Sequence, residues 1–171
     1  MDRRRAFMVL PGESRTQITG ALGGEIYAKV SGADTAGTWA MFEISTAPRE
    51  GPPLHYHLTQ DEWFYVLAGE HEFLIGSERY HIQAGGSVLA FRMVPHTWQN
   101  IGTTAGRLLA LVEPAGEVEE FFVEFSRLIS QGHPESGEVA QLFARYDMKM
   151  VGPSLNVEDS LERISTETEP V

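Results

Sequence analysis

The chain has 171 residues, of which 42% are hydrophobic and 22% charged, and this composition is typical of one globular domain with a real core. Its formal net charge of −11 argues against nucleic acid as a partner, because phosphate contacts need clusters of Lys and Arg. The absence of cysteine excludes disulfides and thiolate chemistry, and it favours a reducing, cytoplasmic location. The apolar run at residues 6–10 is too short for a signal peptide or a membrane span, so no membrane association is expected.

In chain order, residues 1–23 are rich in Gly, Pro and hydroxyl side chains and indicate an N-terminal arm with at most one short strand. Residues 24–113 consist of short runs of β-branched and aromatic residues separated by Gly-rich turns, which is the pattern of an all-β barrel or sandwich. The runs that we expect to form strands are 25–30, 38–46, 55–57, 62–67, 71–75, 78–82, 87–91, 96–101 and 107–112.

The hydrophobic period changes after the turn at residues 114–116. Residues 117–130 and 137–146 carry apolar side chains at helical spacing, so we expect a helical extension over residues 114–147, packed outside the barrel. Residues 148–171 form a tail that begins extended and is expected to be disordered beyond about residue 164. The sequence therefore predicts one domain in four consecutive parts.

The run at residues 62–67 is apolar on both faces. If Glu62 faces inward, Trp63, Tyr65 and Leu67 face outward and need a cover. The two C-terminal helices, the N-terminal arm or a second subunit can each provide it. We expect a homodimer, because two-fold pairs are the commonest assemblies of soluble proteins. Trp39 and Met41 would extend the outward row.

Two histidines one residue apart, His55 and His57, share one face of a strand because side chains alternate with period two. Glu62 follows four intervening residues and can face the pair across a hairpin, and His96 would join them from further along the chain. Three imidazoles and one carboxylate suit a divalent transition metal, namely Fe, Mn, Ni, Cu, Co or Zn. The alternatives are a hydrogen-bonded cluster without metal, a closed tetrahedral site and an octahedral site with open positions.

The spacing His-x-His-x4-Glu-x6-Gly, followed by Gly-x9-His-x3-Asn, resembles the two sequence motifs of the cupin family. The resemblance covers about residues 40–113 and implies a small double-stranded β-helix, or jelly-roll, barrel. It also implies that the metal ligands are His55, His57, Glu62 and His96. The second motif departs from the family pattern, which has Pro-x-Gly five and three residues before its histidine, where this chain has Phe91 and Met93.

Four further residues would point into the same space as the ligands if the strand pleat holds. Residues of this kind are usually simply core, but around a metal in a barrel they also form an apolar pocket that favours an apolar or aromatic substrate. Asn100 would orient a ligand or close a strand hydrogen bond rather than bind metal. The candidate substrate-pocket residues are Phe64, Val66, Trp98 and Asn100. The remaining histidines, His71, His81 and His133, fit no ligand spacing and are expected on the surface or in loops.

Among cupins, the chain is most similar to small members related to bacterial quercetinase-type dioxygenases. That resemblance implies a metal that binds dioxygen or polarises an enol or phenol oxygen of a small-molecule substrate, with Glu62 as general base. The competing hypotheses are a metal-containing barrel that binds a small molecule without turnover, a purely structural barrel, and a cupin that isomerises sugars, decarboxylates acids or opens rings.

Overall fold

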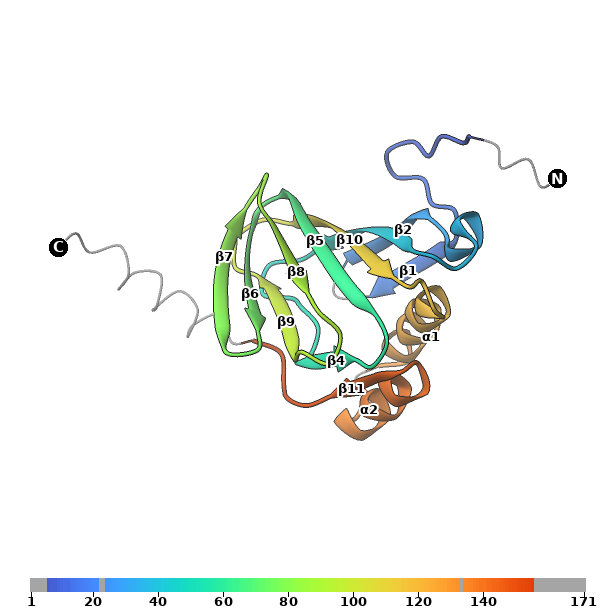
Figure 1. The fold of residues 1–171 in the computed structure, drawn as a ribbon. Helices are drawn as coiled ribbons and strands as arrows, with labels where there is room; N and C mark the ends of the chain where they lie inside the picture. Colours follow the sequence, from blue (N-terminus) through green and yellow to red (C-terminus); the bar gives the residue numbers. More distant parts are fainter. Residues whose placement is uncertain (1–5, 22–23, 133, 156–171) are drawn as a thin grey trace.

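The computed structural model describes residues 6–21, 24–132 and 134–155. Two antiparallel sheets face each other around a hydrophobic core, which confirms the expected jelly-roll fold with two C-terminal helices (Figure 1). The six-stranded sheet has the order β1 (Gln17–Ala21), β2 (Gly24–Val30), β3 (Ala40–Thr46), β10 (Gly106–Glu113), β5 (Asp61–Ala68) and β8 (Ser87–Ala90). The five-stranded sheet has the order β11 (Met148–Met150), β4 (His55–His57), β9 (His96–Asn100), β6 (Glu70–Ile75) and β7 (Glu78–Gln83).

The core follows from the period-two patterning of the central strands. Along β3 and β5 buried and half-buried residues alternate, so each strand turns one face inward as expected. At the centre of the sheet, Ala110 of β10 lies between Phe42 of β3 and Phe64 of β5 in the strand register. The small side chain between two large ones allows the inner layer to pack without a gap.

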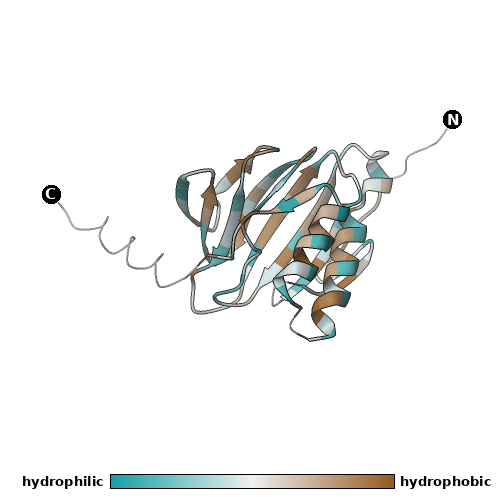
Figure 2. Ribbon diagram, turned by 90° about the horizontal axis from the view of Figure 1, so that it is seen from below, coloured by the Kyte–Doolittle hydropathy of each residue, from teal (hydrophilic) through white to brown (hydrophobic). Residues whose placement is uncertain are grey.

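The two expected helices are present, as α1 (Val118–Ser130) and α2 (Ser136–Arg145). They lie side by side against one end of the strands (Figure 2). The rings of Phe121 and Phe143 meet edge to face at 5.0 Å between centroids, and Phe122 meets Phe42 of the barrel in the same way at 5.0 Å. The helices therefore close one end of the barrel and contribute to its core. Among the described residues, no helix has the length and apolar character needed to cross a membrane.

Helix α1 is fixed to the N-terminal part of the chain by one carboxylate. Glu119 accepts hydrogen bonds from the Ser31 hydroxyl at 2.7 Å, the Gly32 amide at 2.8 Å and the Thr16 hydroxyl at 2.6 Å. Ser31 also caps the short 3-10 helix Gly32–Thr35. These contacts set where α1 begins, and so they determine which of its side chains reach into the barrel.

The chain beyond α2 returns to the barrel as strand β11. Met148 pairs with His57 and Met150 with His55 in an antiparallel register. The amide of Leu58 adds a hydrogen bond of 2.8 Å to the carbonyl of Asp147. The C-terminal extension thus supports the short strand that carries two of the candidate ligands.

The expectation for His71 was wrong. This residue lies on β6, between β7 and β9, and its side chain is fully buried on the inner face. Its Nε2 lies 3.1 Å from the Thr46 hydroxyl, and its Nδ1 has no hydrogen-bond partner among the described residues. Burial lowers the pKa of His71 from 6.5 to about 4. His81 is exposed on β7 as expected, and His133 lies outside the described residues.

The buried His71 predicts a pH dependence of stability. The folded-state pKa of about 4 lies below the ordinary value of 6.5, so the unfolded chain takes up this proton first as the pH falls. The contribution of neutral His71 is complete above pH 6.5 and is lost as the pH falls towards 4. Across that pH window, we expect His71→Gln to reduce the change in the free energy of unfolding by about 1–3 kcal/mol. The plot of that free energy against pH should therefore be less steep for the variant. Urea titrations at several pH values test this, and parallel slopes for the two proteins would contradict it.

Candidate metal centre

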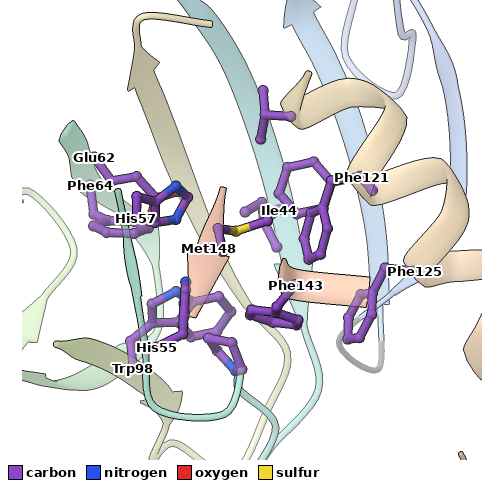
Figure 3. A pocket seen from close by; sticks show the side chains of 13 residues that line it. Ile44, His55, His57, Glu62, Phe64, Trp98, Phe121, Phe125, Phe143 and Met148 are labelled. Atoms are coloured by element: carbon purple, nitrogen blue, oxygen red, sulfur yellow. The ribbon is translucent and has the colours of Figure 1, made fainter. Parts of the chain in front are cut away.

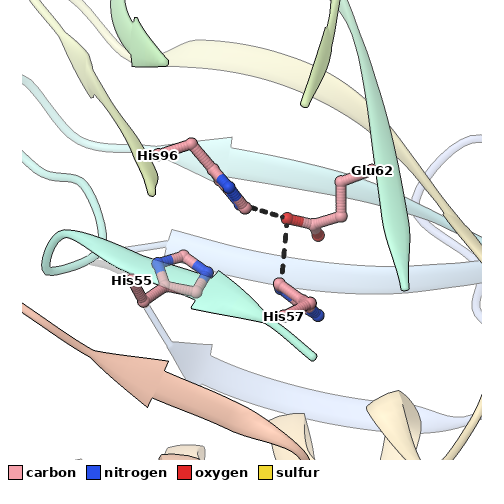
Figure 4. Close-up of side chains that lie close together, drawn as sticks. All are labelled: His55, His57, Glu62 and His96. Carbon is pink, nitrogen blue, oxygen red and sulfur yellow. Dashed lines mark hydrogen bonds and ion pairs between the residues drawn. The ribbon is translucent and has the colours of Figure 1, made fainter. Parts of the chain in front are cut away.

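Four side chains converge inside the barrel from three strands (Figure 4). His55 and His57 both point inward from β4 because one residue separates them, and His96 of β9 is paired with His55 in the register. Glu62 approaches from β5, in the opposite sheet. The four residues offer ligand atoms that all lie within 4.8 Å of one another. The structure thus brings together all four residues that the sequence singled out.

The cluster is buried and tightly packed. None of the four residues is more than 7% exposed. One carboxylate oxygen of Glu62, Oε2, lies 2.9 Å from Nε2 of His96 and 3.3 Å from Nε2 of His57. Because every member is removed from water, the charges and lone pairs of the cluster must be satisfied within it.

The three imidazoles are oriented by acceptors on their far side. Nδ1 of His55 lies 2.9 Å from the carbonyl of Pro53, and Nδ1 of His96 lies 2.9 Å from the carbonyl of Val94. A carbonyl oxygen only accepts, so each Nδ1 carries the proton, and the lone pair of a neutral ring remains on Nε2. This is the arrangement in which outer hydrogen bonds fix metal-binding histidines.

The third ring is held by a side chain, Gln60. Its Oε1 lies 2.8 Å from Nδ1 of His57, while its Nε2 donates to the carbonyls of Pro114 at 3.1 Å and Ala115 at 2.8 Å. Those two carbonyls fix which end of the amide faces the histidine. Gln60 therefore couples the orientation of His57 to the segment that leads into α1. Sequence reasoning missed Gln60, because the turn between His57 and Glu62 has no ligand-like spacing.

The electrostatics of Glu62 and His55 match what a divalent metal requires, whereas the pKa shift of His57 favours its protonated form. Burial opposes the ionised form of Glu62, but the neighbouring His57 and His96 outweigh it and hold the pKa of the carboxyl well below its usual range. Burial, with the charges of His96 and His57, lowers the pKa of His55 to about 3. Burial also acts to lower the pKa of His57, but the Glu62 carboxylate outweighs burial and raises this pKa overall. An anionic carboxylate and neutral imidazole are the forms that bind metal.

The nitrogen and oxygen donor atoms of the cluster suit a cation. Nε2 of His57 is buried and makes no well-formed hydrogen bond to the described residues, although Oε2 of Glu62 lies 3.3 Å away. Imidazole Nε2 atoms and a carboxylate are electron-pair donors, and nitrogen and oxygen donors of this kind suit first-row transition metals. The residues present therefore fit a metal of that class.

The cluster forms part of the wall of a cavity of about 40 Å³, which the Phe-rich faces of α1 and α2 close (Figure 3). A water molecule needs about 10–15 Å³ of such volume, so the cavity holds a few waters or a small diatomic molecule. The lining residues are Ile44, Pro52, His55, His57, Glu62, Phe64, Trp98, Val118, Phe121, Phe122, Phe125, Phe143 and Met148.

The structure separates the four expected pocket residues into two pairs. Phe64 and Trp98 line the cavity beside the cluster. Val66 is buried in the core and Asn100 is fully buried, but neither is among the residues that line the cavity. The strand pleat places both on the inner face, but they lie further along their strands than the cavity extends. Asn100 instead closes the loop after β9, donating to the carbonyls of Thr46 at 3.0 Å and Thr104 at 2.9 Å.

The loop before His96 has no Pro-x-Gly but keeps a defined shape. Met93, at the glycine position of the family pattern, has a positive φ of 67°, and its amide donates to the carbonyl of His57 at 2.8 Å. Arg92 pairs with both oxygens of Asp61, at 2.9 and 2.7 Å, and its amide donates to the same carboxylate at 2.7 Å. These bonds fix the loop that leads into His96.

The positive φ of Met93 predicts how a substitution at this position changes stability. A left-handed backbone conformation costs a non-glycine residue about 1–2 kcal/mol, and the Met93 side chain is 57% exposed, so it contributes little packing. We expect Met93→Gly to raise the free energy of unfolding by up to about 1 kcal/mol, since the added freedom of the unfolded chain offsets part of the gain. Chemical denaturation measures this, with Met93→Ala as the control that removes the side chain and keeps the strain. Equal stabilities of the Gly and Ala variants would contradict the account.

The fold and the buried histidine–glutamate set are those of a metal-binding barrel. Residues 42–112, which include all four cluster residues, match the family described as Cupin domain. No curated protein matches the chain in sequence.

Solved structures share the fold at low identity. KdgF from Halomonas sp. is 12% identical with a TM-score of 0.58, over 67% of this chain and 99% of that one. The polyketide cyclase RemF from Streptomyces resistomycificus is 18% identical with a TM-score of 0.54, over 64% and 80% of the two chains. A mutant of the oxalate decarboxylase OxdC from Bacillus subtilis is 20% identical with a TM-score of 0.51, over 58% and 28%. Another structural study of that decarboxylase concerns its Mn(II) centres.

Proposed function

We propose that this cupin is a metal-dependent enzyme, a dioxygenase that acts on a small aromatic or enolisable molecule. The observation that carries the proposal is the buried set of three histidines and one glutamate, of which His55, His57 and Glu62 line an otherwise apolar, aromatic cavity. A structural neighbour with Mn(II) centres supports a divalent metal at the same kind of site. The residues that would hold the metal are His55, His57, Glu62 and His96.

When bound, a divalent transition metal supplies Lewis acidity to a substrate oxygen and, if redox-active, one-electron chemistry with dioxygen. The chain itself supplies the proton acceptor. Glu62 is ionised, buried and directed into the cavity, so it can take the proton from the enol or phenol hydroxyl of a bound substrate. The phenylalanines that line the cavity exclude water from the reacting groups.

The charges around the cavity favour a neutral substrate. Among the described lining residues there is no Lys or Arg, and Glu62 is the one carboxylate. A small dicarboxylate or a sugar phosphate would have only the proposed metal, and no Lys or Arg of the lining, to pair with. This argues for an aromatic or enolisable substrate over the acid substrate named for the decarboxylase neighbour.

The size of the cavity favours one alternative. Its volume of about 40 Å³ suits a barrel that holds a metal and a few waters without turnover. A non-catalytic metal-containing binding protein is therefore the second candidate.

Metal analysis is the first test. We expect about one divalent metal per chain in the purified protein, and we expect His57→Ala to remove most of it, because the loss of one ligand weakens binding at least about tenfold. His81→Ala is the matched control, since this histidine is exposed on β7 and outside the cluster. A metal-free protein after growth with supplied Fe, Mn, Ni, Cu, Co and Zn would overturn the proposal, as would full occupancy in His57→Ala.

Dioxygen uptake separates the two candidates. The metal-loaded protein would be mixed with flavonols, catechols and β-diketones, and dioxygen consumption measured with an electrode. We expect consumption with at least one of these classes, at a rate that falls with the metal content of His57→Ala. Full metal occupancy with no consumption of any compound would favour the non-catalytic binding protein.

We also propose that the protein forms a homodimer through the outer face of the six-stranded sheet. In the strand register, Met41, Leu111, Trp63 and Leu89 form one apolar row across β3, β10, β5 and β8. Leu89 is 42% exposed, and α1 and α2 pack against β1 and β11. A continuous apolar row of this kind is typical of an interaction surface, and a second copy offers the same complementary face.

The oligomer is tested by light scattering at micromolar concentration. We expect twice the chain mass of 19.0 kDa, and we expect Trp63→Glu to give a folded monomer, because a charge in the row would be buried without a partner. Tyr80→Glu, on the exposed face of β7 in the other sheet, is the control that should stay dimeric. A mass of one chain for the unmodified protein would overturn this proposal.

A further inference from the structure

A second, much larger hollow lies outside the barrel. This groove has a volume of about 760 Å³, within the range of about 300–1,000 Å³ that is usual for small-molecule pockets. The C-terminal half of α1, the start of α2, the segment 150–154 and the loop 50–53 form its walls. Its described lining is mainly apolar and includes Phe125, Ile129, Pro134, Val139, Met150 and Pro153.

The floor of the groove is held by backbone hydrogen bonds. The amides of Val151 and Gly152 donate to the carbonyl of Leu54 at 2.8 and 3.2 Å, and the amide of Leu54 donates to the carbonyl of Pro153 at 3.1 Å. The hydroxyl of Ser154 donates to the carbonyl of Gly51 at 3.2 Å. These bonds tie the segment 151–154 to residues 51–54, so this side of the groove is a formed feature of the fold.

Phe125 is the one described residue that lines both the groove and the cavity beside the metal-binding cluster. Its ring stacks on Phe121 at 5.5 Å between centroids and meets Phe143 edge to face at 6.0 Å. Figure 3 shows Phe125 and Phe143 next to each other on the helical side of the cavity. The Phe125 ring thus stands between the two spaces.

We propose that the groove is the binding subsite for the body of the substrate and that the Phe125 side chain is the partition through which its reactive end reaches the cluster. The inference rests on the proposed function. A cavity of about 40 Å³ cannot enclose an aromatic ring, whereas the adjoining groove can. Rotation of Phe125 towards the groove joins the two spaces without any change in the strands.

The lining also defines the class of substrate. Glu50 is the only charged residue among the described residues of the groove, and the remainder are apolar or uncharged. An anionic molecule would meet a carboxylate and no cation there. The groove therefore takes a neutral, largely apolar aromatic molecule, with a hydroxyl or enol at the end that approaches the cluster.

The partition is tested with Trp98, which lines the inner cavity and is one of three tryptophans in the chain. In a Trp39→Phe/Trp63→Phe background, acrylamide quenching reports access to that cavity without metal or substrate. We expect Phe125→Ala to raise the quenching constant about fivefold or more, because a buried tryptophan becomes reachable from the groove. Phe122→Ala is the matched control, since it removes the same atoms from α1 but lines only the inner cavity.

Equal increases for Phe125→Ala and Phe122→Ala would overturn the partition, because they would indicate a general loosening of the helices. Phe125→Leu is a second variant for use if the alanine variant does not fold. It should raise the quenching constant to an intermediate value, and a value at or below that of the parent would also count against the partition.

The groove itself is tested with two ligands of the same ring system, neutral 2-naphthol and anionic 2-naphthoate. Titration calorimetry on the metal-free protein should show 2-naphthol binding about tenfold more tightly than 2-naphthoate. Val139→Trp, which fills the groove from α2, should weaken 2-naphthol binding about tenfold or more. Equal affinities for the two ligands, or unchanged affinity in Val139→Trp, would overturn the assignment.

The quenching and naphthol-binding measurements need neither metal nor turnover. The groove proposal and the proposed enzymatic function can therefore be overturned independently of each other. If the protein binds no metal but passes the naphthol and quenching tests, the groove proposal stands and the proposed enzymatic function is overturned. If the protein catalyses a metal-dependent oxygenation and Val139→Trp has the same KM as the unmodified protein, the proposed function stands and the groove proposal is overturned.

Discussion

The burial of one negative charge, the carboxylate of Glu62, is the constraint on which the rest of this structure depends. An ionised carboxylate in an apolar cavity is strongly unfavourable unless partners surround it. Here His57 and His96 hold its pKa well below the usual range, so the charge persists inside the barrel. The three imidazole rings lie close to the same carboxylate, and this donor set fits the proposed metal cation.

That requirement extends outward through a chain of hydrogen bonds. Gln60 orients His57 and at the same time donates to the carbonyls of Pro114 and Ala115, at the beginning of the helical extension. Glu119, in the first turn of α1, is bonded in turn to Ser31 and Gly32. The position of the helices over the cavity and the orientation of a candidate ligand are thus fixed by polar contacts made within the same short segment, residues 114–119.

The sequence predicted those parts of the structure that depend on local periodicity. Alternation with period two placed His55 and His57 on one face and Phe64 beside them, and the change to helical spacing located α1 and α2. Periodicity assigns a face to a side chain but not a depth, which explains why Val66 and Asn100 lie away from the cavity and why His71 is buried. Gln60 and the groove could not be predicted, because both arise from the packing of segments distant in the sequence.

The family match and the helical extension contain different parts of the candidate site. The match stops at residue 112, before α1, and contains all four cluster residues. The phenylalanines of the helices that line the cavity, Phe125 and Phe143 among them, belong to the extension beyond it, as do most of the residues that line the groove. Proteins as different as a decarboxylase and a polyketide cyclase share this fold, so the fold alone does not fix the reaction or the substrate. On the proposed route from the groove to Glu62, the choice of substrate would rest with the helical extension, because that route passes its phenylalanines.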